Sequence, residues 1–281
     1  MDFRYVVCDV FTDRPLTGNQ LAVFTDARAI PEAMLPLLAR EMNFSETAFV
    51  YPASAGGHAK IRIFTPGREL PFAGHPVLGA AFVLGGPLQL ETIVLETGMG
   101  LVPVALQREG PRIIFGWMTQ PIPKVETMPE AAAILAALGG VKATLPVERY
   151  VNGPRHVMVN IESPDHVARL VPDFAALARA TDNGVSCFAG SGARWKTRMF
   201  APGHGTNEDP ATGSAAGPLA CHLLRHGRIA SGDEIEIAQG AEIGRPSTLY
   251  ARVTGTREAI AAVEVGGSAV AVARGEFRLP A

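Results

Sequence analysis

The sequence lacks the features that mark several large classes of protein. No stretch approaches the roughly 20 consecutive apolar residues of a membrane-spanning helix, so we expect no membrane partner. Lysine and arginine are scattered and nearly balanced by acids, with a formal net charge of -2, which argues against a nucleic-acid partner. A small molecule is left as the expected partner.

Cysteines are few and follow no pattern. Cys8, Cys187 and Cys221 form no CxxC pair and no even-numbered framework, which favours reduced thiols over a disulfide scaffold. The first residues, 1–7, interleave acid and base without a sustained apolar core, so we expect no signal peptide. Both observations predict a cytoplasmic protein.

Common catalytic and ligand motifs are also missing. The sequence has no GxxxxGKS/T loop and no full dinucleotide fingerprint, so nucleotide phosphate is an unfavoured ligand. Ser214 lies in Thr-Gly-Ser-Ala-Ala and not in GxSxG, which favours a ligand-donating hydroxyl over an acyl-transfer nucleophile. His222 and His226 have a metal-compatible spacing, but no HExxH and no third ligand near them in the sequence. The helix dipole explains a histidine in a last turn, and we expect no metal.

One passage does occur twice. Residues 62–76 and 198–215 share an Arg-apolar-Phe strand end, a Pro-Gly turn, a glutamate and a glycine that starts an apolar helix. The copies are about 136 residues apart, which indicates a duplicated domain and not a solenoid. In this alignment His75 matches Ser214 and Leu70 matches Asp209. Glu69 matches Glu208, which suggests a structural role common to both copies.

The duplication and the length predict two domains. The 281 residues, 47% of them apolar, can form two modest cores. The Gln-Pro-Ile-Pro run at 120–123 is the expected linker, because two prolines exclude helix and central strand. We expect an N-terminal lobe of residues 1–119, completed by C-terminal residues 266–281, and a C-terminal lobe of residues 120–265.

Apolar periodicity and turn residues place the elements. The expected strands are 5–10, 20–24, 44–50, 58–65, 90–95, 99–107, 112–117, 147–151, 156–162, 185–189, 194–200, 234–238 and 248–255, with a final hairpin near 260–278. The expected helices are 31–43, 77–84, 129–138, 174–181 and 213–226. We expect Gly85-Gly86-Pro87 to stop the second of these helices.

Chemistry is expected where the two duplicated helices begin. Gly74 and Gly213 open them, and the free N–H groups and positive dipole end there attract a small carboxylate. His75 could be a general acid or a ligand donor, or simply a satisfied polar group. Asp209 could share in proton transfer, or only cap a helix.

Glu46 is a further candidate, outside the repeat. It shares one face of an apolar strand with Ala48 and Val50. Either the strand begins at the surface, or the carboxylate is a buried proton-transfer group.

Five runs, in order along the whole chain, resemble the phenazine biosynthesis PhzF-like family. They are Asp9–Phe11, Gly18–Val23, Asn43–Thr47, Gly74–Gly79 and Asp209–Ala215. The resemblance implies an α+β fold with two pseudo-symmetric lobes of the diaminopimelate epimerase type, each a sheet wrapped around a central helix. Gln20 stands where many relatives have proline.

The resemblance also implies a function. It implies a cofactor-independent isomerase that shuttles a proton on a small cyclic or amino-carboxylate bound in a cleft between the lobes. Glu46 would be the acid/base, assisted by His75 and Asp209. The groups that hold the substrate would be Asn19, Ser45, Gly74, Gly213, Ser214 and Ala215. A homodimer is implied as well.

Two alternatives stay open at this point. One is a protein that binds a small carboxylate without catalysis. The other is a cofactor-free racemase or dehydratase of the same fold. Racemases of this fold use two opposed cysteines, whereas the matching positions here are His75 and Ser214.

Overall fold

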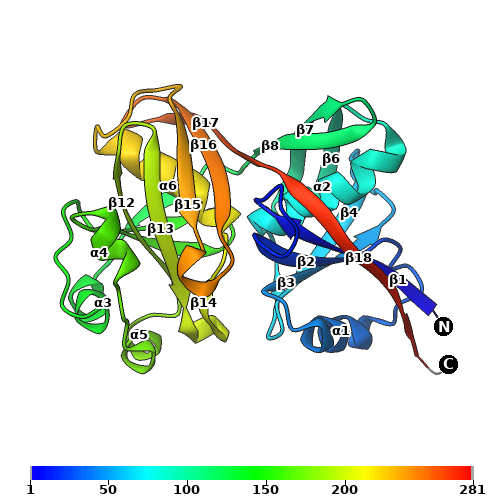
Figure 1. Ribbon diagram of the computed structural model, residues 1–281, viewed down its shortest axis with the longest axis horizontal. Helices are drawn as coiled ribbons and strands as arrows, with labels where there is room; N and C mark the ends of the chain where they lie inside the picture. The colour runs from blue at the N-terminus through cyan, green and yellow to red at the C-terminus, as the bar shows by residue number, and fades with distance from the viewer. Residues whose placement is uncertain (1, 280–281) are drawn as a thin grey trace. The chain divides into compact units, whose positions relative to one another are not determined.

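A computed structural model describes residues 2–279 and shows two compact units, each drawn with its own sheet and central helix in Figure 1. Unit 1 joins the chain up to Thr119 to the part from Gly266 onward, and unit 2 is Gln120–Val265. Among the described residues, no helix combines the length and the apolar character needed to cross a membrane.

Unit 1 is a sheet with one enclosed helix. Its elements are β1 (Asp2–Val10), β2 (Asn19–Phe24), η1 (Glu32–Met34), α1 (Leu35–Met42), β3 (Glu46–Tyr51), β4 (Ala59–Phe64), β5 (Glu69–Leu70), α2 (Gly74–Leu88), β6 (Thr92–Thr97), β7 (Gly100–Glu109), β8 (Arg112–Thr119) and β18 (Ala269–Arg278). β1 pairs antiparallel with β18 and β2, and the sheet continues through β3, β4, β6, β7 and β8. Because α2 contacts β18 and β1 at one end of this order, β2 and β3 in the middle, and β6, β7 and β8 at the other end, the sheet wraps around it. This confirms the predicted lobe architecture.

Unit 2 repeats this plan. Its elements are β9 (Lys124–Thr127), α3 (Ala131–Ala137), β10 (Glu148–Val151), β11 (Arg155–Asn160), α4 (Pro164–Ala168), α5 (Phe174–Ala180), β12 (Gly184–Ser191), β13 (Arg194–Ala201), η2 (Pro202–His204), β14 (Thr206–Asp209), α6 (Gly213–Arg225), β15 (Glu234–Gln239), η3 (Ala241–Ile243) and β16 (Ser247–Gly255). The pairings of β10 through β16 have the same directions as those of β1 through β7. The short elements β5, β9, β14 and α4 were not expected from the sequence.

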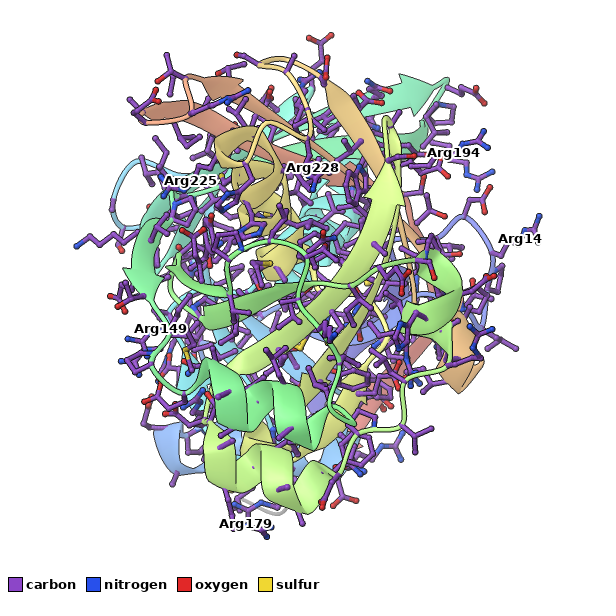
Figure 2. All side chains as sticks on the ribbon, turned by 90° about the vertical axis from the view of Figure 1, so that its left-hand side faces the viewer. Arg14, Arg149, Arg179, Arg194, Arg225 and Arg228 are labelled. Atoms are coloured by element: carbon purple, nitrogen blue, oxygen red, sulfur yellow. The ribbon has the colours of Figure 1, made fainter. Side chains whose placement is uncertain are left out.

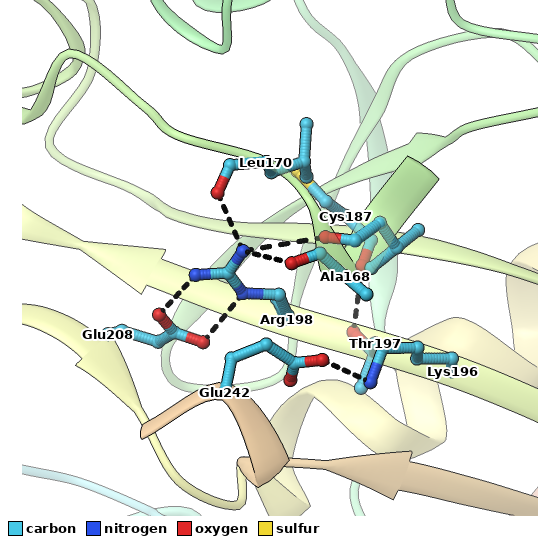
Figure 3. Close-up of polar contacts among 9 residues, drawn as sticks. Ala168, Leu170, Cys187, Lys196, Thr197, Arg198, Glu208 and Glu242 are labelled. Atoms are coloured by element: carbon cyan, nitrogen blue, oxygen red, sulfur yellow. Dashed lines mark hydrogen bonds and ion pairs between the residues drawn. The ribbon is translucent and has the colours of Figure 1, made fainter. Parts of the chain in front are cut away.

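The duplicated passage makes the same salt bridge in both units. In unit 1 the guanidinium of Arg62 donates to both oxygens of Glu69, each at 2.7 Å, and lies 5.2 Å from the Phe64 ring centroid. In unit 2, Arg198 donates to Glu208 at 2.8 and 2.7 Å (Figure 3). Its guanidinium lies 5.0 Å from the Phe200 ring centroid. The predicted common structural role of the two glutamates is confirmed. Glu69 holds the short strand β5 against β4, and Glu208 holds the short strand β14 against β13.

The two copies of this salt bridge differ in burial. The side chains of Arg198 and Glu208 are 9% and 7% exposed, whereas those of Arg62 and Glu69 are 22% and 42% exposed. Arg198 Nη1 also donates to the carbonyls of Leu170 and Ala168, at 2.7 and 3.2 Å (Figure 3). The unit 2 pair therefore also ties the end of α4 to β13.

The predicted end of the first central helix is wrong. α2 continues through Gly85-Gly86-Pro87 to Leu88, and Gln89 caps it in the left-handed conformation with φ 53°. Gly85 is a packing glycine, because a Cβ there would lie 2.4 Å from Leu106 Cδ1. Pro87 lies in the last turn, where it removes a single helical hydrogen bond. Glycines that resemble a stop signal instead allow close contact with the sheet.

The predicted final hairpin is also wrong. Only Ser268 separates β17 (Ile260–Gly267) from β18, and a hairpin needs a longer turn. β18 instead pairs along its length with β1, from Asp2↔Arg278 to Val10↔Ala269. A near-continuous strand path carries the chain from unit 2 back into unit 1.

Each unit buries a second apolar cluster on the side of the sheet away from its central helix. In unit 1, Phe24 and Phe49 stack at 4.9 Å and pack with Leu35 and Leu38 of α1. In unit 2, α3 and α5 cover Val157, Val185 and Phe200. Figure 2 looks onto these two helices, and Arg179 at the end of α5 points away from them into solvent. Because these strands are covered on both faces, their sequences are nearly continuous apolar runs.

A loop in unit 1 is held by a carboxylate of β6. Glu96 accepts backbone N–H bonds from Ser54, Ala55 and Gly57, as well as the Ser54 hydroxyl. Burial alone would raise the pKa of Glu96, but these donors outweigh it and lower the pKa to about 2. The charged form of Glu96 therefore stabilises the folded state.

We expect Glu96→Gln to lower the melting temperature at neutral pH. The folded pKa lies below the ordinary value of 4.5, so the contribution is present above pH 4.5 and is lost as pH falls toward 2. Melting curves of wild type and variant across this range should therefore converge in acid. The exposed Glu91→Gln is the matched control and should follow wild type throughout. A Glu96→Gln deficit of constant size at every pH would contradict the assignment.

Candidate functional site

Glu46 and His75 meet in unit 1. Glu46 begins β3, which runs parallel to β2 with Leu21 opposite Glu46, and His75 is the second residue of α2. Phe49 packs toward α1, so strand alternation turns Glu46 toward α2. Glu46 Oε2 lies 3.5 Å from His75 Nε2. The carboxylate predicted on an apolar strand thus faces the imidazole predicted at a helix start.

His75 is buried and neutral at physiological pH. Burial lowers the pKa of its imidazole to about 3, against a weaker opposing effect of the Gln20 backbone. Asn19 Nδ2 lies 3.2 Å from His75 Nδ1, and an amide NH₂ can only donate. With the Asn19 amide oriented as donor to Nδ1, the proton of the neutral ring is assigned to Nε2, the atom that faces Glu46. Nε2 itself has no hydrogen-bond partner in the described chain.

The other predicted binding residues of unit 1 lie beside this pair. Ser45 directly precedes Glu46, and Gly74 is the first residue of α2. The N-cap residue of α2, Ala73, has no side chain that could accept an N–H of the first turn. The N–H groups of Gly74 and His75 therefore point out of the helix start without a cap.

Asp209 of unit 2 ends β14, directly before α6. Its carboxylate accepts a hydrogen bond from the hydroxyl of Thr212, the N-cap of α6. Gln239 Nε2 donates to the Asp209 carbonyl at 2.8 Å and to Thr212 Oγ1 at 3.0 Å, and Gln239 Oε1 accepts the Thr212 N–H at 3.1 Å. Because Thr212 turns its hydroxyl to Asp209, it does not cap the helix. The Asp209 carboxylate and the start of α6 are therefore held together by hydrogen bonds.

Ser214 has an imidazole partner that sequence reasoning missed. His156 of β11 places Nε2 3.0 Å from Ser214 Oγ, and both residues are buried. Asn152 donates to the Ser214 carbonyl at 3.0 Å, and Gln120 donates to the Gly213 carbonyl at 2.9 Å. These contacts fix the first turn of α6, where Gly213, Ser214 and Ala215 lie. Only the fold brings these polar residues to the helix, so spacing in the sequence carried no signal for them.

The cysteines are not placed for proton transfer at the helix starts. Cys8 lies in β1, Cys187 in β12 and Cys221 near the end of α6, and all three are buried and free. Burial raises the pKa of Cys8 and of Cys221 to about 12, and raises that of Cys187 as well. The titratable side chains beside the helix starts are instead Glu46 with His75 at α2, and Asp209 with His156 at α6.

His222 and His226 have a third potential ligand nearby in space, which the sequence did not indicate. Glu148, at the start of β10, places a carboxylate oxygen beside both imidazoles. Glu148 lies far from the histidines in the sequence, and strand β10 brings it to the end of α6.

Comparisons with known proteins give the family of the chain. The family model described as phenazine biosynthesis-like protein matches residues 8–275. The trans-2,3-dihydro-3-hydroxyanthranilate isomerase of Pseudomonas aeruginosa is 51% identical over 276 residues, covering 98% of this chain and 99% of that protein.

Solved structures show the same fold. The phenazine biosynthesis protein of the PhzF family from Bacillus anthracis superposes with a TM-score of 0.85 at 23% identity, covering 99% of this chain and 100% of that chain. A Pseudomonas aeruginosa protein described as a predicted epimerase gives a TM-score of 0.82 at 30% identity, with the same coverage. The chain therefore belongs to the phenazine biosynthesis-like protein family, and it is an isomerase.

Proposed function

We propose that this isomerase moves a proton within a small cyclic carboxylate through Glu46, without a cofactor. The observation that carries the proposal is the contact of 3.5 Å between Glu46 Oε2, which is partly exposed, and the buried His75 Nε2 at the start of α2. A carboxylate beside a neutral N–H donor, at the positive end of a helix, can take and return a proton near developing negative charge. The substrate named for the 51% identical relative is an anthranilate, which carries a carboxylate on a ring.

The proposed reaction has two balanced steps. In the first, a ring C–H bond breaks, the proton forms an O–H bond with Glu46, and the electron pair is delocalised into the conjugated ring. In the second, Glu46 returns the proton to another ring carbon and becomes a carboxylate again. His75 stays neutral and donates its Nε2–H to the negative charge, since its lowered pKa disfavours the imidazolium. Asp209 is proposed to assist proton transfer.

The substrate carboxylate is proposed to bind the N–H groups at the starts of α2 and α6, with Asn19, Ser45 and Ser214 as further donors. The uncapped first turns support this assignment. The homodimer implied by the family resemblance stays a prediction, which sedimentation velocity checks.

The test is an assay of the desalted protein with trans-2,3-dihydro-3-hydroxyanthranilate and no added cofactor. We expect multiple turnovers to an isomer of unchanged mass, followed by absorbance and mass spectrometry. Ser214→Ala should raise KM more than it lowers kcat, because it removes a binding hydroxyl. Turnover that depends on an added nucleotide or pyridoxal phosphate would contradict the proposal. So would binding of the substrate with no conversion.

A further inference from the structure

A second cluster of polar groups lies in unit 2, at the opposite end of α6 from Ser214. Glu148 Oε2 lies 3.2 Å from His222 Nδ1 and 3.0 Å from His226 Nε2. One ligand atom from each of the three residues lies within 4.8 Å of the others. His222 is two turns along α6 from Ser214, about 12 Å at 1.5 Å per residue, so the cluster is not part of the candidate active site.

The spacing of these atoms suits a tetrahedral cation. With ligand bonds of about 2.1 Å, two ligand atoms of a regular tetrahedron are about 3.4 Å apart. The two carboxylate-to-imidazole distances, 3.2 and 3.0 Å, are within a few tenths of an ångström of that value. The two histidines are one helical turn apart, with ring centroids at 4.4 Å, so their nitrogens reach the same point on the surface of α6.

Neighbouring groups hold the carboxylate in place. The Tyr150 hydroxyl donates to Glu148 Oε2 at 3.0 Å and lies 3.2 Å from His222 Nδ1. Arg225, labelled at the end of α6 in Figure 2, approaches the other carboxylate oxygen, Glu148 Oε1, at 3.6 Å. Oε2 is thus the oxygen that both imidazoles share. His226 and Glu148 are 20% and 17% exposed, which leaves a path from solvent, whereas His222 is fully buried.

We propose that Glu148, His222 and His226 bind one divalent cation of the zinc class, with water or the Tyr150 oxygen as fourth ligand. Two imidazoles and one carboxylate are ligands that Zn²⁺ prefers, and Mg²⁺ and Ca²⁺ favour oxygen-only sites. The cation would tie β10 to the last turn of α6. β10 leads directly into Asn152, which holds the first turn of α6 through the Ser214 carbonyl. The site is structural and independent of the proposed proton transfer.

The test uses chelator-treated full-length protein titrated with ZnCl₂ in a calorimeter, and with CoCl₂ by visible absorption. We expect one Zn²⁺ per chain, a rise in melting temperature with Zn²⁺, and a tetrahedral Co²⁺ spectrum. His226→Gln and Glu148→Gln should each weaken Zn²⁺ binding about tenfold or more, and abolish the Co²⁺ spectrum. His226 is partly exposed, so its variant should fold even if variants of buried residues do not.

His166→Gln, in α4 of the same unit, is the matched control and should bind Zn²⁺ like wild type. Three results would overturn the proposal: no binding of Zn²⁺ by the wild type up to millimolar concentration, equal binding by the wild type and His226→Gln, or a Co²⁺ spectrum of octahedral type. The cluster would then be only a hydrogen-bonded group that joins β10 to α6.

Discussion

Glu46→Gln should lower kcat by about 10² to 10⁴-fold, because it removes the group proposed to carry the proton and keeps the size of the side chain. The glutamine amide can still contact His75 Nε2, which lies 3.5 Å from the carboxylate in the wild type. Substrate affinity should therefore stay within a few-fold of wild type. Steady-state turnover and equilibrium binding of the same variant measure both quantities.

The matched control is Glu41→Gln, an exposed carboxylate of α1 in the same unit, which should keep wild-type turnover. A Glu46→Gln enzyme with near wild-type kcat would remove Glu46 from the mechanism. Loss of binding in step with turnover would assign Glu46 to substrate binding instead.

Glu208→Gln should destabilise the protein by about 3 kcal/mol, because it leaves the buried guanidinium of Arg198 without its countercharge. The carbonyls of Leu170 and Ala168 would still accept from Arg198, but they carry no charge. The protein contains its own control in the duplicated pair. Glu69→Gln should cost about 0.5 kcal/mol, since Arg62 is more exposed and keeps Glu32 at 2.6 and 2.7 Å.

Urea unfolding of both variants measures this difference. The two glutamates share backbone geometry and an arginine partner, and they differ in burial and in the second carboxylate, Glu32, that only Arg62 contacts. Equal losses of stability in the two variants would contradict this account, in which burial and the lack of a second carboxylate make Glu208 the more important of the two glutamates.

The duplicated passage was the part of the fold most readable from the sequence. Local chemistry fixes a strand end at Phe64, a Pro-Gly turn and a helix start at Gly74, and the second copy repeats it up to Gly213. The end of α2 could not be predicted from the sequence, because Gly85 is needed to leave room for the side chain of Leu106 on strand β7. A glycine needed for packing looks the same in a sequence as one that ends a helix.

The candidate site was readable only in part for the same reason. Gly74 and Gly213 stand in a local pattern, so their positions at helix starts could be expected. The partners that orient the helix starts, His156 and Gln239, come from other strands and have no local signature. Glu148 was missed as a partner of the histidines because β10 precedes α6 by many residues.

The central claim is that Glu46 carries the proton between ring carbons. Prolonged incubation of substrate and enzyme in D₂O, analysed by NMR, tests it most directly. Each time Glu46 holds the proton as a carboxylic acid, exchange with solvent can occur, so deuterium should accumulate at the ring carbons joined by the isomerisation. Glu46→Gln at the same concentration should show none above the rate without enzyme. Equal deuterium incorporation by the wild type and by Glu46→Gln would contradict the claim.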